Sequence, residues 1–304
     1  MICLKCAFVV HEWNNHTHSF DFFKRILKKT FKVKEFQGIN WKENNSPNIK
    51  KINEYDPSLV IFCQTLPTVT YLRKLKCKNI VWLPMYDGVL GWKVAIIKSI
   101  AYNLTCNLKV VCFSEKLYSR MKYFFNCKLV KYFPKPKKRV NFDKKILFFW
   151  ERRKEITWAI VKKIIKSKEF DKIIIKQCND PHDTNKRIKS TSKIQVISKW
   201  LSKNKYDKLL SKANFFIAPR TKEGIGHSFL EAMSQGMIVL CHNDATMNEY
   251  IKNNKTGLIF NYKNPKKISI KNANEISKNT HNYVKEGYEK WKIQQEEITN
   301  WLKK

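Results

Sequence analysis

The sequence is poor in acidic side chains and in long apolar stretches. It has 25 Asp and Glu against 60 Lys and Arg, which gives a formal net charge of +35. Its apolar N-terminal patch contains a lysine and is too short and too polar for a signal peptide or a membrane span. Low-complexity segments and internal repeats are also absent. We therefore expect a folded cytoplasmic protein.

The nine cysteines lack the pattern of a disulfide framework or a zinc site. Most lie inside apolar runs such as VIFCQ, residues 60–64, which is typical of reduced core residues. Cys3 and Cys6 form a CxxC, but no second pair completes a metal site. The cysteines predict neither disulfides nor a metal centre.

The excess of positive charge is spread over the whole chain and indicates an anionic partner. Nucleic acid is not favoured, because no zinc-finger, RNP-like or Arg/Gly-rich signature accompanies the charge. An anionic membrane surface fits better, since each Lys or Arg near such a surface contributes on the order of 1 kcal/mol. A solvated, Lys-rich surface is the alternative.

The 304 residues suit two domains in which strands alternate with helices, as in parallel α/β sheets. Strand-like runs cover 3–10, 31–36, 58–63, 79–85, 109–114 and 128–133, and then 145–150, 171–177, 193–198, 214–220, 237–241 and 257–260. Helix-like runs in the first half cover 19–30, 93–103 and 115–125. The basic, proline-bearing segment FPKPKKR, residues 133–139, predicts an interdomain linker. We expect domains at 1–136 and 137–271 and a long helix at 272–304.

One stretch, KEGIGHSFLEAMSQGMIVL at 222–240, carries the most information about chemistry. The buried strand NFFIAPR precedes it, Gly224 and Gly226 permit a tight turn around Ile225, and a helix is predicted from His227. The N-terminus of such a helix presents unpaired amides and attracts anions, of which a diphosphate is a common example.

Two carboxylates, Glu223 and Glu231, flank this predicted anion site. Carboxylates only accept hydrogen bonds, so one could bind hydroxyls of a sugar and the other those of a ribose. A lone Glu on an amphipathic helix is usually solvated, so the interpretation depends on the whole combination of residues.

The two carboxylates, the LEAM helix, Gly236 and the strand MIVLC together resemble retaining glycosyltransferases of family 4, also called glycosyl transferases group 1. The resemblance continues through 243–260 with Glu249 and Gly257. It implies the GT-B fold, with two Rossmann-like parallel-sheet domains facing across a cleft and a C-terminal helix returning to the N-terminal domain. It also implies that Glu223 contacts the donor sugar and that Glu231 holds the ribose.

The resemblance further implies cations that neutralise the donor diphosphate in the loop after the first strand of the second domain. Arg152, Arg153 and Lys154 occupy that loop, and which of them reaches the phosphate is left open. Arg220, where the family more often has a small residue, is a candidate third contact. Such enzymes need no bound metal, because arginines and helix amides supply the positive charge, so no cofactor is expected.

Acceptor contacts are expected from loops of the N-terminal domain. The loop HEWNNHTHS after the first strand offers His11, Asn15 and His16, with His18 beside them. Asp87 ends another strand, where turn formation alone would also explain an Asp-Gly pair.

The resemblance implies transfer of a sugar from a nucleoside-diphosphate sugar to a hydroxyl of a glycan or lipid-linked acceptor, with retention at the anomeric carbon. Synthesis of bacterial surface polysaccharide or lipooligosaccharide, at the inner face of the cytoplasmic membrane, fits the charge. Two alternatives stay open: a polyanion-binding protein on a degenerate transferase fold, and a sugar-nucleotide epimerase or phosphorylase of the same architecture.

Overall fold

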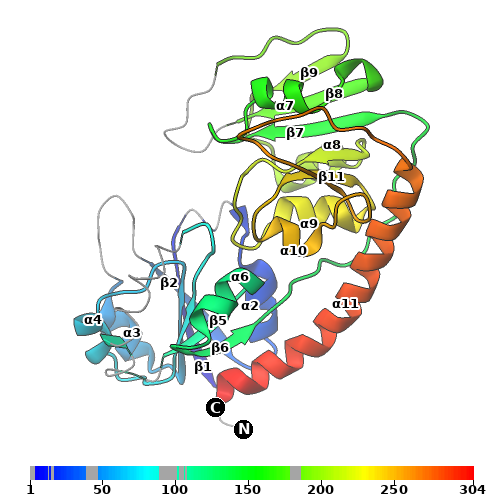
Figure 1. Cartoon of the computed structure of the whole chain (residues 1–304). Coiled ribbons are helices and arrows are strands. Elements are labelled where there is room, and N and C mark those ends of the chain that lie inside the picture. Colours follow the sequence, from blue (N-terminus) through cyan, green and yellow to red (C-terminus); the bar gives the residue numbers. More distant parts are fainter. Residues whose placement is uncertain are drawn as a thin grey trace. The chain divides into compact units, whose positions relative to one another are not determined.

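The structure is a computed structural model that describes residues 4–12, 14, 17–38, 47–88, 101–102, 106, 108–178 and 186–304. The chain forms two compact units (Figure 1). The first comprises Met1–Lys131 and Trp291–Lys304, and the second comprises Tyr132–Lys290. Each contains a parallel sheet with helices, so the predicted α/β class is confirmed.

The sheet of the first unit has the strand order β2-β1-β3-β4-β5-β6, and all described pairs are parallel. The strands are β1 (Lys5–Val10), β2 (Lys32–Gln37), β3 (Leu59–Cys63), β4 (Ile80–Leu83), β5 (Lys109–Cys112) and β6 (Asn126–Leu129). The helices are α2 (Asp21–Leu27), α3 (Ile49–Tyr55), α4 (Val69–Arg73) and α6 (Glu115–Met121). The helix expected at 93–103 falls largely outside the described residues.

Burial explains why these segments become strands. All five residues of β3, LVIFC, are buried, as a central parallel strand covered on both faces requires. The edge strand β2, KVKEFQ, instead exposes its charged side chains. Polar caps begin the next helices: Asn48 Oδ1 accepts from Lys51 N at 3.1 Å, and Ser114 Oγ accepts from Leu117 N at 3.3 Å.

The sheet of the second unit has the order β12-β11-β10-β7-β8-β9, again parallel throughout the described pairs. The strands are β7 (Ile146–Glu151), β8 (Lys172–Gln177), β9 (Ile194–Ile197), β10 (Phe215–Ile217), β11 (Ile238–His242) and β12 (Leu258–Phe260). The helical elements are α7 (Trp158–Ile164), the 3-10 turn η1 (Ser167–Glu169), α8 (Lys203–Leu210), α9 (His227–Ser234) and α10 (Met247–Tyr250).

This order fixes where a ligand would bind in the second unit. The chain runs outward from β7 through β8 to β9, then returns to β10 on the other side of β7. Loops leaving the carboxyl ends of β7 and β10 therefore diverge, which creates the switch point where open α/β sheets bind ligands. The loop 152–157 follows β7 and the loop 218–226 follows β10.

Helix α11 (Ala273–Lys303) contributes to both units and confirms the predicted C-terminal helix. Near its start, Ile276 joins the apolar core of the second unit. Near its end, Trp291 packs with its ring centroid 5.8 Å from that of Phe22, and Gln294 Oε1 accepts from Lys131 N at 2.9 Å within the first unit.

Two further expectations concern the cysteines and the membrane. The eight cysteines in the described residues are free thiols, and Cys6, Cys63, Cys106, Cys112 and Cys241 are buried. Over the described ranges, no helix is both long enough and apolar enough to span a bilayer.

Candidate functional site

The loop from β10 to α9 has the strand, turn and helix that its sequence predicts. Gly226 caps α9 with φ +84°, and a Cβ there would collide with the Phe229 ring, so the position requires glycine. Thr246 Oγ1 braces the turn by donating to the carbonyls of Glu223 at 2.9 Å and Gly224 at 3.2 Å. The buried Ile225 lies between the two glycines. The first amides of α9 therefore lie in a fixed loop.

Glu223 is buried beside a cation. Its carboxylate Oε2 lies 4.0 Å from Nη1 of Arg220, and the two side chains are only 10% and 8% exposed. At that distance the pair is electrostatic and does not meet the geometry of a hydrogen bond. A largely buried carboxylate at the start of a glycine-bearing turn is suited to accept hydrogen bonds from hydroxyl groups.

Glu155, which the sequence analysis did not select, joins the two loops. Its Oε2 accepts hydrogen bonds from the main-chain amide of Thr221 at 3.0 Å and from the Thr221 hydroxyl at 2.9 Å. Burial tends to raise the pKa of Glu155, but those bonds and the charges of Arg220 and Arg153 hold it below its usual value. The only sequence signal was a carboxylate directly after Arg-Arg-Lys.

The predicted cations follow β7, yet they differ in their surroundings. Arg152 Cζ lies 5.2 Å from the ring centroid of Trp150, whereas Arg153 acts electrostatically on Glu155. Both arginines are half-buried and Lys154 is exposed. Contact between a phosphate and one or more of these three residues stays a prediction.

Glu151, the last residue of β7, accepts two hydrogen bonds from the protein itself. Its Oε1 accepts from Trp158 N at 2.8 Å at the start of α7, and its Oε2 accepts from Gln177 Nε2 at 2.7 Å. Burial raises the pKa of Glu151. The carboxylate therefore fixes the end of the loop that carries the arginines.

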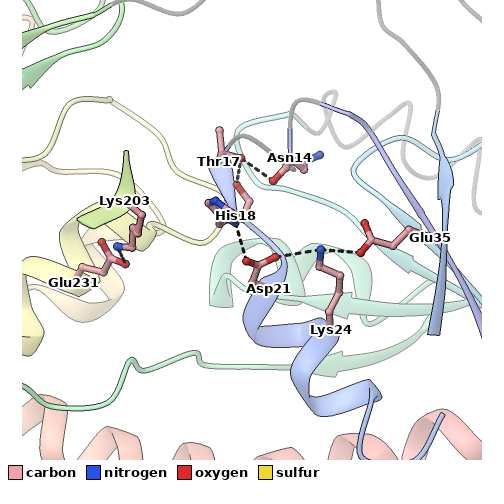
Figure 2. Close-up of polar contacts among 9 residues, drawn as sticks. Asn14, Thr17, His18, Asp21, Lys24, Glu35, Lys203 and Glu231 are labelled. Carbon is pink, nitrogen blue, oxygen red and sulfur yellow. Dashed lines mark hydrogen bonds and ion pairs between the residues drawn. The ribbon is translucent and has the colours of Figure 1, made fainter. Parts of the chain in front are cut away.

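Glu231 lies on α9 and is paired with a lysine that the sequence analysis missed. Figure 2 shows Lys203 and Glu231 facing each other; Lys203 Nζ lies 2.7 Å from Glu231 Oε1 and 2.9 Å from Asp207 Oδ1. Burial opposes the charge of Lys203, but the two carboxylates outweigh it and raise its pKa. The pair holds one oxygen of Glu231 in a defined position.

An aromatic cluster with a buried lysine lies at the carboxyl end of β8. Lys176 is 2% exposed, and its Nζ lies 3.5 Å from the ring centroid of Trp150, 4.4 Å from that of Trp200 and 5.5 Å from that of Tyr206. Burial raises the pKa of Tyr206, and the charge of Glu231 acts in the same direction. The sequence carries no signal for this cluster, because Lys176 follows an apolar run and resembles the solvated end of a strand.

The remaining candidates lie at loops of either unit. His11 follows β1 and is half-buried, and Asp87 is half-buried in the turn after β4 that Gly88 N closes onto Met85 O at 3.0 Å. Asn15 and His16 lie outside the described residues. His227 begins α9, with its ring centroid 5.1 Å from that of Tyr132.

His18 takes part in a chain of polar contacts within the first unit. Its Nδ1 lies 2.8 Å from Asp21 Oδ2, and Lys24 Nζ bridges Asp21 Oδ1 at 3.1 Å and Glu35 Oε1 at 3.0 Å (Figure 2). Across the described ranges, no group of three or more His, Cys, Asp or Glu could hold a metal ion.

Comparisons with known proteins identify the fold. Residues 190–291, from just before β9 into α11, match the model of the family described as glycosyl transferases group 1. No curated protein matches the sequence. Solved structures with low identity are similar over nearly the whole chain.

Three of these structures illustrate the similarity. Sucrose-phosphate synthase from Thermosynechococcus elongatus has a TM-score of 0.65 at 11% identity, covering 98% of this chain and 99% of that chain. HepE from Anabaena in complex with UDP and glucose has a TM-score of 0.60 at 10% identity, with coverage of 98% and 100%. The lipopolysaccharide outer core galactosyltransferase WaaB has a TM-score of 0.56 at 10% identity, with coverage of 93% and 91%. The two parallel-sheet units therefore have the GT-B fold, as predicted.

Proposed function

We propose that this chain is a glycosyltransferase that moves a sugar from a nucleoside-diphosphate sugar to a hydroxyl of an acceptor, with retention of anomeric configuration. One observation carries the proposal: buried Glu223 lies beside Arg220 in the glycine-bearing turn that begins α9, within the segment that matches glycosyl transferases group 1. A charged pair buried at a sheet switch point is typical of a functional site.

The sugar-nucleotide donor would be bound by main-chain amides and side chains of two adjacent loops, the one after β7 and the one after β10. Amides at the N-terminus of α9 would bind the diphosphate, assisted by the helix dipole. Arg152 and Arg153 would neutralise its charge from the loop after β7, to which Glu155 ties the α9 turn. Glu223 would accept hydrogen bonds from the sugar, and Glu231 would accept them from the ribose.

The proposed reaction breaks the bond between the anomeric carbon and the diphosphate oxygen. The departing diphosphate takes the electron pair, and the arginines and helix amides stabilise its growing charge. The acceptor hydroxyl attacks the same face of the sugar and passes its proton to the leaving phosphate oxygen. This scheme assigns no metal and no dedicated base, since the protein's own cations supply the charge.

The acceptor is proposed to be a growing glycan or a lipid-linked saccharide of bacterial surface polysaccharide or lipooligosaccharide synthesis, reached from the cytoplasmic face of the membrane. The net charge of +35 supports an anionic surface as partner. WaaB, which has a similar fold, is described as a lipopolysaccharide outer core galactosyltransferase.

A screen of nucleotides by thermal unfolding tests the donor site. UDP, GDP, ADP, dTDP and CMP are added in turn to wild type, Glu231→Ala and the control Glu286→Ala, an exposed carboxylate on α11. A ligand at about 100 times its dissociation constant adds roughly 2.7 kcal/mol. We expect one nucleotide to stabilise wild type and Glu286→Ala but not Glu231→Ala. Equal indifference to all five, with stabilisation by heparin, would favour a polyanion-binding protein.

The reaction class is tested with the donor sugar of the selected nucleotide. Release of the nucleoside diphosphate should accelerate when glycan or lipid-linked acceptors are added, and proton NMR of the product should show the donor's anomeric configuration. An inverted product would contradict retention. Conversion of the donor into an isomeric sugar nucleotide without any acceptor would indicate an epimerase.

A further inference from the structure

The basic linker segment borders a cavity in the second unit that the proposed transferase site does not use. The cavity has a volume of about 560 Å³. Its lining includes Lys137, Arg139, Lys144, Ile146, Lys212 and Asn214. Below it is called the linker cavity.

The linker cavity lies at the opposite end of the sheet from the proposed donor site. Ile146 is the first residue of β7, whereas Arg152 follows its last residue. Asn214 likewise precedes β10, whereas Arg220 follows it. Six residues of strand span roughly 20 Å, so one ligand of nucleotide size cannot occupy both places.

The lining is strongly cationic. Lys137, Lys138, Arg139, Lys144 and Lys212 are opposed by a single acid, Asp143. Over the described residues, none of the four lysines forms an ion pair, while Arg139 Nη1 donates to Asn274 O and Ser277 Oγ, both at 3.4 Å. Like charges gathered around one cavity repel each other, and a bound anion would relieve that repulsion.

The main chain around the linker cavity is held in place. Lys137 N donates to Ser234 O and Val140 N donates to Gln235 O, both at 2.9 Å.

Buried Asn214 fixes the rest of the wall. Its Nδ2 donates to Asn141 O at 2.7 Å and Lys144 O at 2.6 Å, and its Oδ1 accepts from Ile146 N at 2.9 Å. The lysine side chains therefore project from a fixed base, which lowers the entropy lost when a ligand binds.

We propose that the linker cavity is a second anion site, which binds a phosphate-bearing ligand independently of the donor site. Lysine ammonium groups bind phosphates as point charges, and the volume lies within the range of about 300–1,000 Å³ usual for small-molecule sites. The ligand is larger than a single phosphate, as a soluble phosphate ester or the phosphorylated head group of a lipid is.

Chemical acetylation of the native protein tests the site without any mutation. The reactivity of each lysine is read by mass spectrometry with and without inorganic pyrophosphate. We expect pyrophosphate to slow the labelling of Lys138, Lys144 and Lys212 about fivefold, and to leave the exposed Lys255 of the same unit unchanged. Protection confined to Lys154 and Lys222, which flank the proposed donor site, would overturn the proposal.

A matched pair of variants separates a built site from bulk charge. Lys138→Gln/Lys144→Gln/Lys212→Gln removes three exposed lysines that line the linker cavity. Lys255→Gln/Lys263→Gln/Lys266→Gln removes the same charge from exposed lysines of the same unit that do not line it. The dissociation constant of pyrophosphate, read from the protection of Lys137, should rise about tenfold in the first variant and stay nearly unchanged in the second. Equal changes in the two variants would overturn the proposal.

Vesicle flotation distinguishes the two sources of the phosphate. If the ligand is a lipid head group, the cavity variant should lose binding to phosphatidylglycerol vesicles while the matched variant keeps it, and neither should bind phosphatidylcholine. If the ligand is soluble, the two variants should bind phosphatidylglycerol equally while pyrophosphate still protects the wild-type lysines.

Discussion

At the residue scale, Glu151 at the end of β7 and Glu155 in the loop after it show how neighbouring groups set the pKa of a carboxyl group. Glu151 is buried and Glu155 is half-buried, and each accepts two hydrogen bonds. The pKa of Glu151 is raised, because its burial outweighs its neutral donors. The pKa of Glu155 is lowered against its own burial, because the two hydrogen bonds from Thr221, and after them the charges of Arg220 and Arg153, favour the ionised carboxylate.

Glu155 should therefore contribute stability that depends on pH. Its folded pKa lies below its unfolded value of about 4.3, so the contribution is complete above that value and is lost as pH falls through the lower folded pKa. We expect Glu155→Gln to lower the free energy of unfolding at pH 7 by about 1–2 kcal/mol, measured in urea, and the difference from wild type to shrink towards pH 3. Glu286→Gln is the control. A difference in the free energy of unfolding between Glu155→Gln and wild type that stays constant with pH would contradict the contribution of the ionised carboxylate.

A second prediction at the residue scale concerns the effect of Lys203 on nucleotide binding. Because it holds Oε1 of Glu231 at 2.7 Å, Lys203→Met should release that carboxylate and weaken binding of the preferred nucleotide about three- to tenfold, as measured by calorimetry. Lys203→Arg should largely restore binding. Lys205→Met, an exposed lysine on the same helix, should have no effect. Tighter binding in Lys203→Met would instead mean that the lysine competes with the ligand.

These residue pairs also mark the limit of prediction from sequence. Lys203 lies 28 positions from Glu231, and Glu155 lies 66 positions from Thr221. Contacts over such separations depend on which strands become neighbours, and α8 and the two loops carry no local signal for them. The turn 223–226 was predictable, because its glycines and the apolar helix after it act locally.

At the scale of elements, strand-like runs predicted every described strand. A central strand such as β3 needs continuous apolar sequence because it is buried on both faces, whereas the edge strand β2 mixes charged with apolar residues. The errors lie at the ends. The run 128–133 was predicted as a strand, whereas β6 covers Asn126–Leu129. Tyr132 and Phe133 are buried but lie beyond β6, so their apolar side chains indicate burial and not strand pairing.

The start of α9 gives a prediction about an element. Gly226 has φ +84°, and a Cβ there would strike the Phe229 ring, whereas a Cβ on Gly88 would meet only Met85 O at 3.8 Å. We expect Gly226→Ala to lower stability by about 2–4 kcal/mol and to abolish nucleotide binding, with Gly88→Ala near neutral in thermal unfolding. If Gly226→Ala were as stable as Gly88→Ala, the turn could relax around the new methyl group. The proposal of a rigid turn that binds the diphosphate would then be wrong.

At the scale of the whole molecule, α11 belongs to two cores. Its N-terminal part supplies Ile276 to the core of the second unit, and its C-terminal part supplies Trp291, 4% exposed, to the first. The sequence predicted the helix from its length and spacing. The sequence pattern did not predict which unit each apolar residue of α11 packs against. The helical spacing of apolar residues is the same for both units.

This division predicts that substitutions in one helix loosen different units. Trp291→Ala removes a buried ring beside Phe22 and should cost about 3–5 kcal/mol, and Ile276→Ala should cost about 2–5 kcal/mol. Hydrogen exchange should then accelerate in β3 for Trp291→Ala and in β7 for Ile276→Ala, because a local opening exposes the core that lost the side chain. Equal acceleration of both strands in both variants would show that the units open as one cooperative body. Separate responses would mean that each sheet keeps its own stability although one helix serves both.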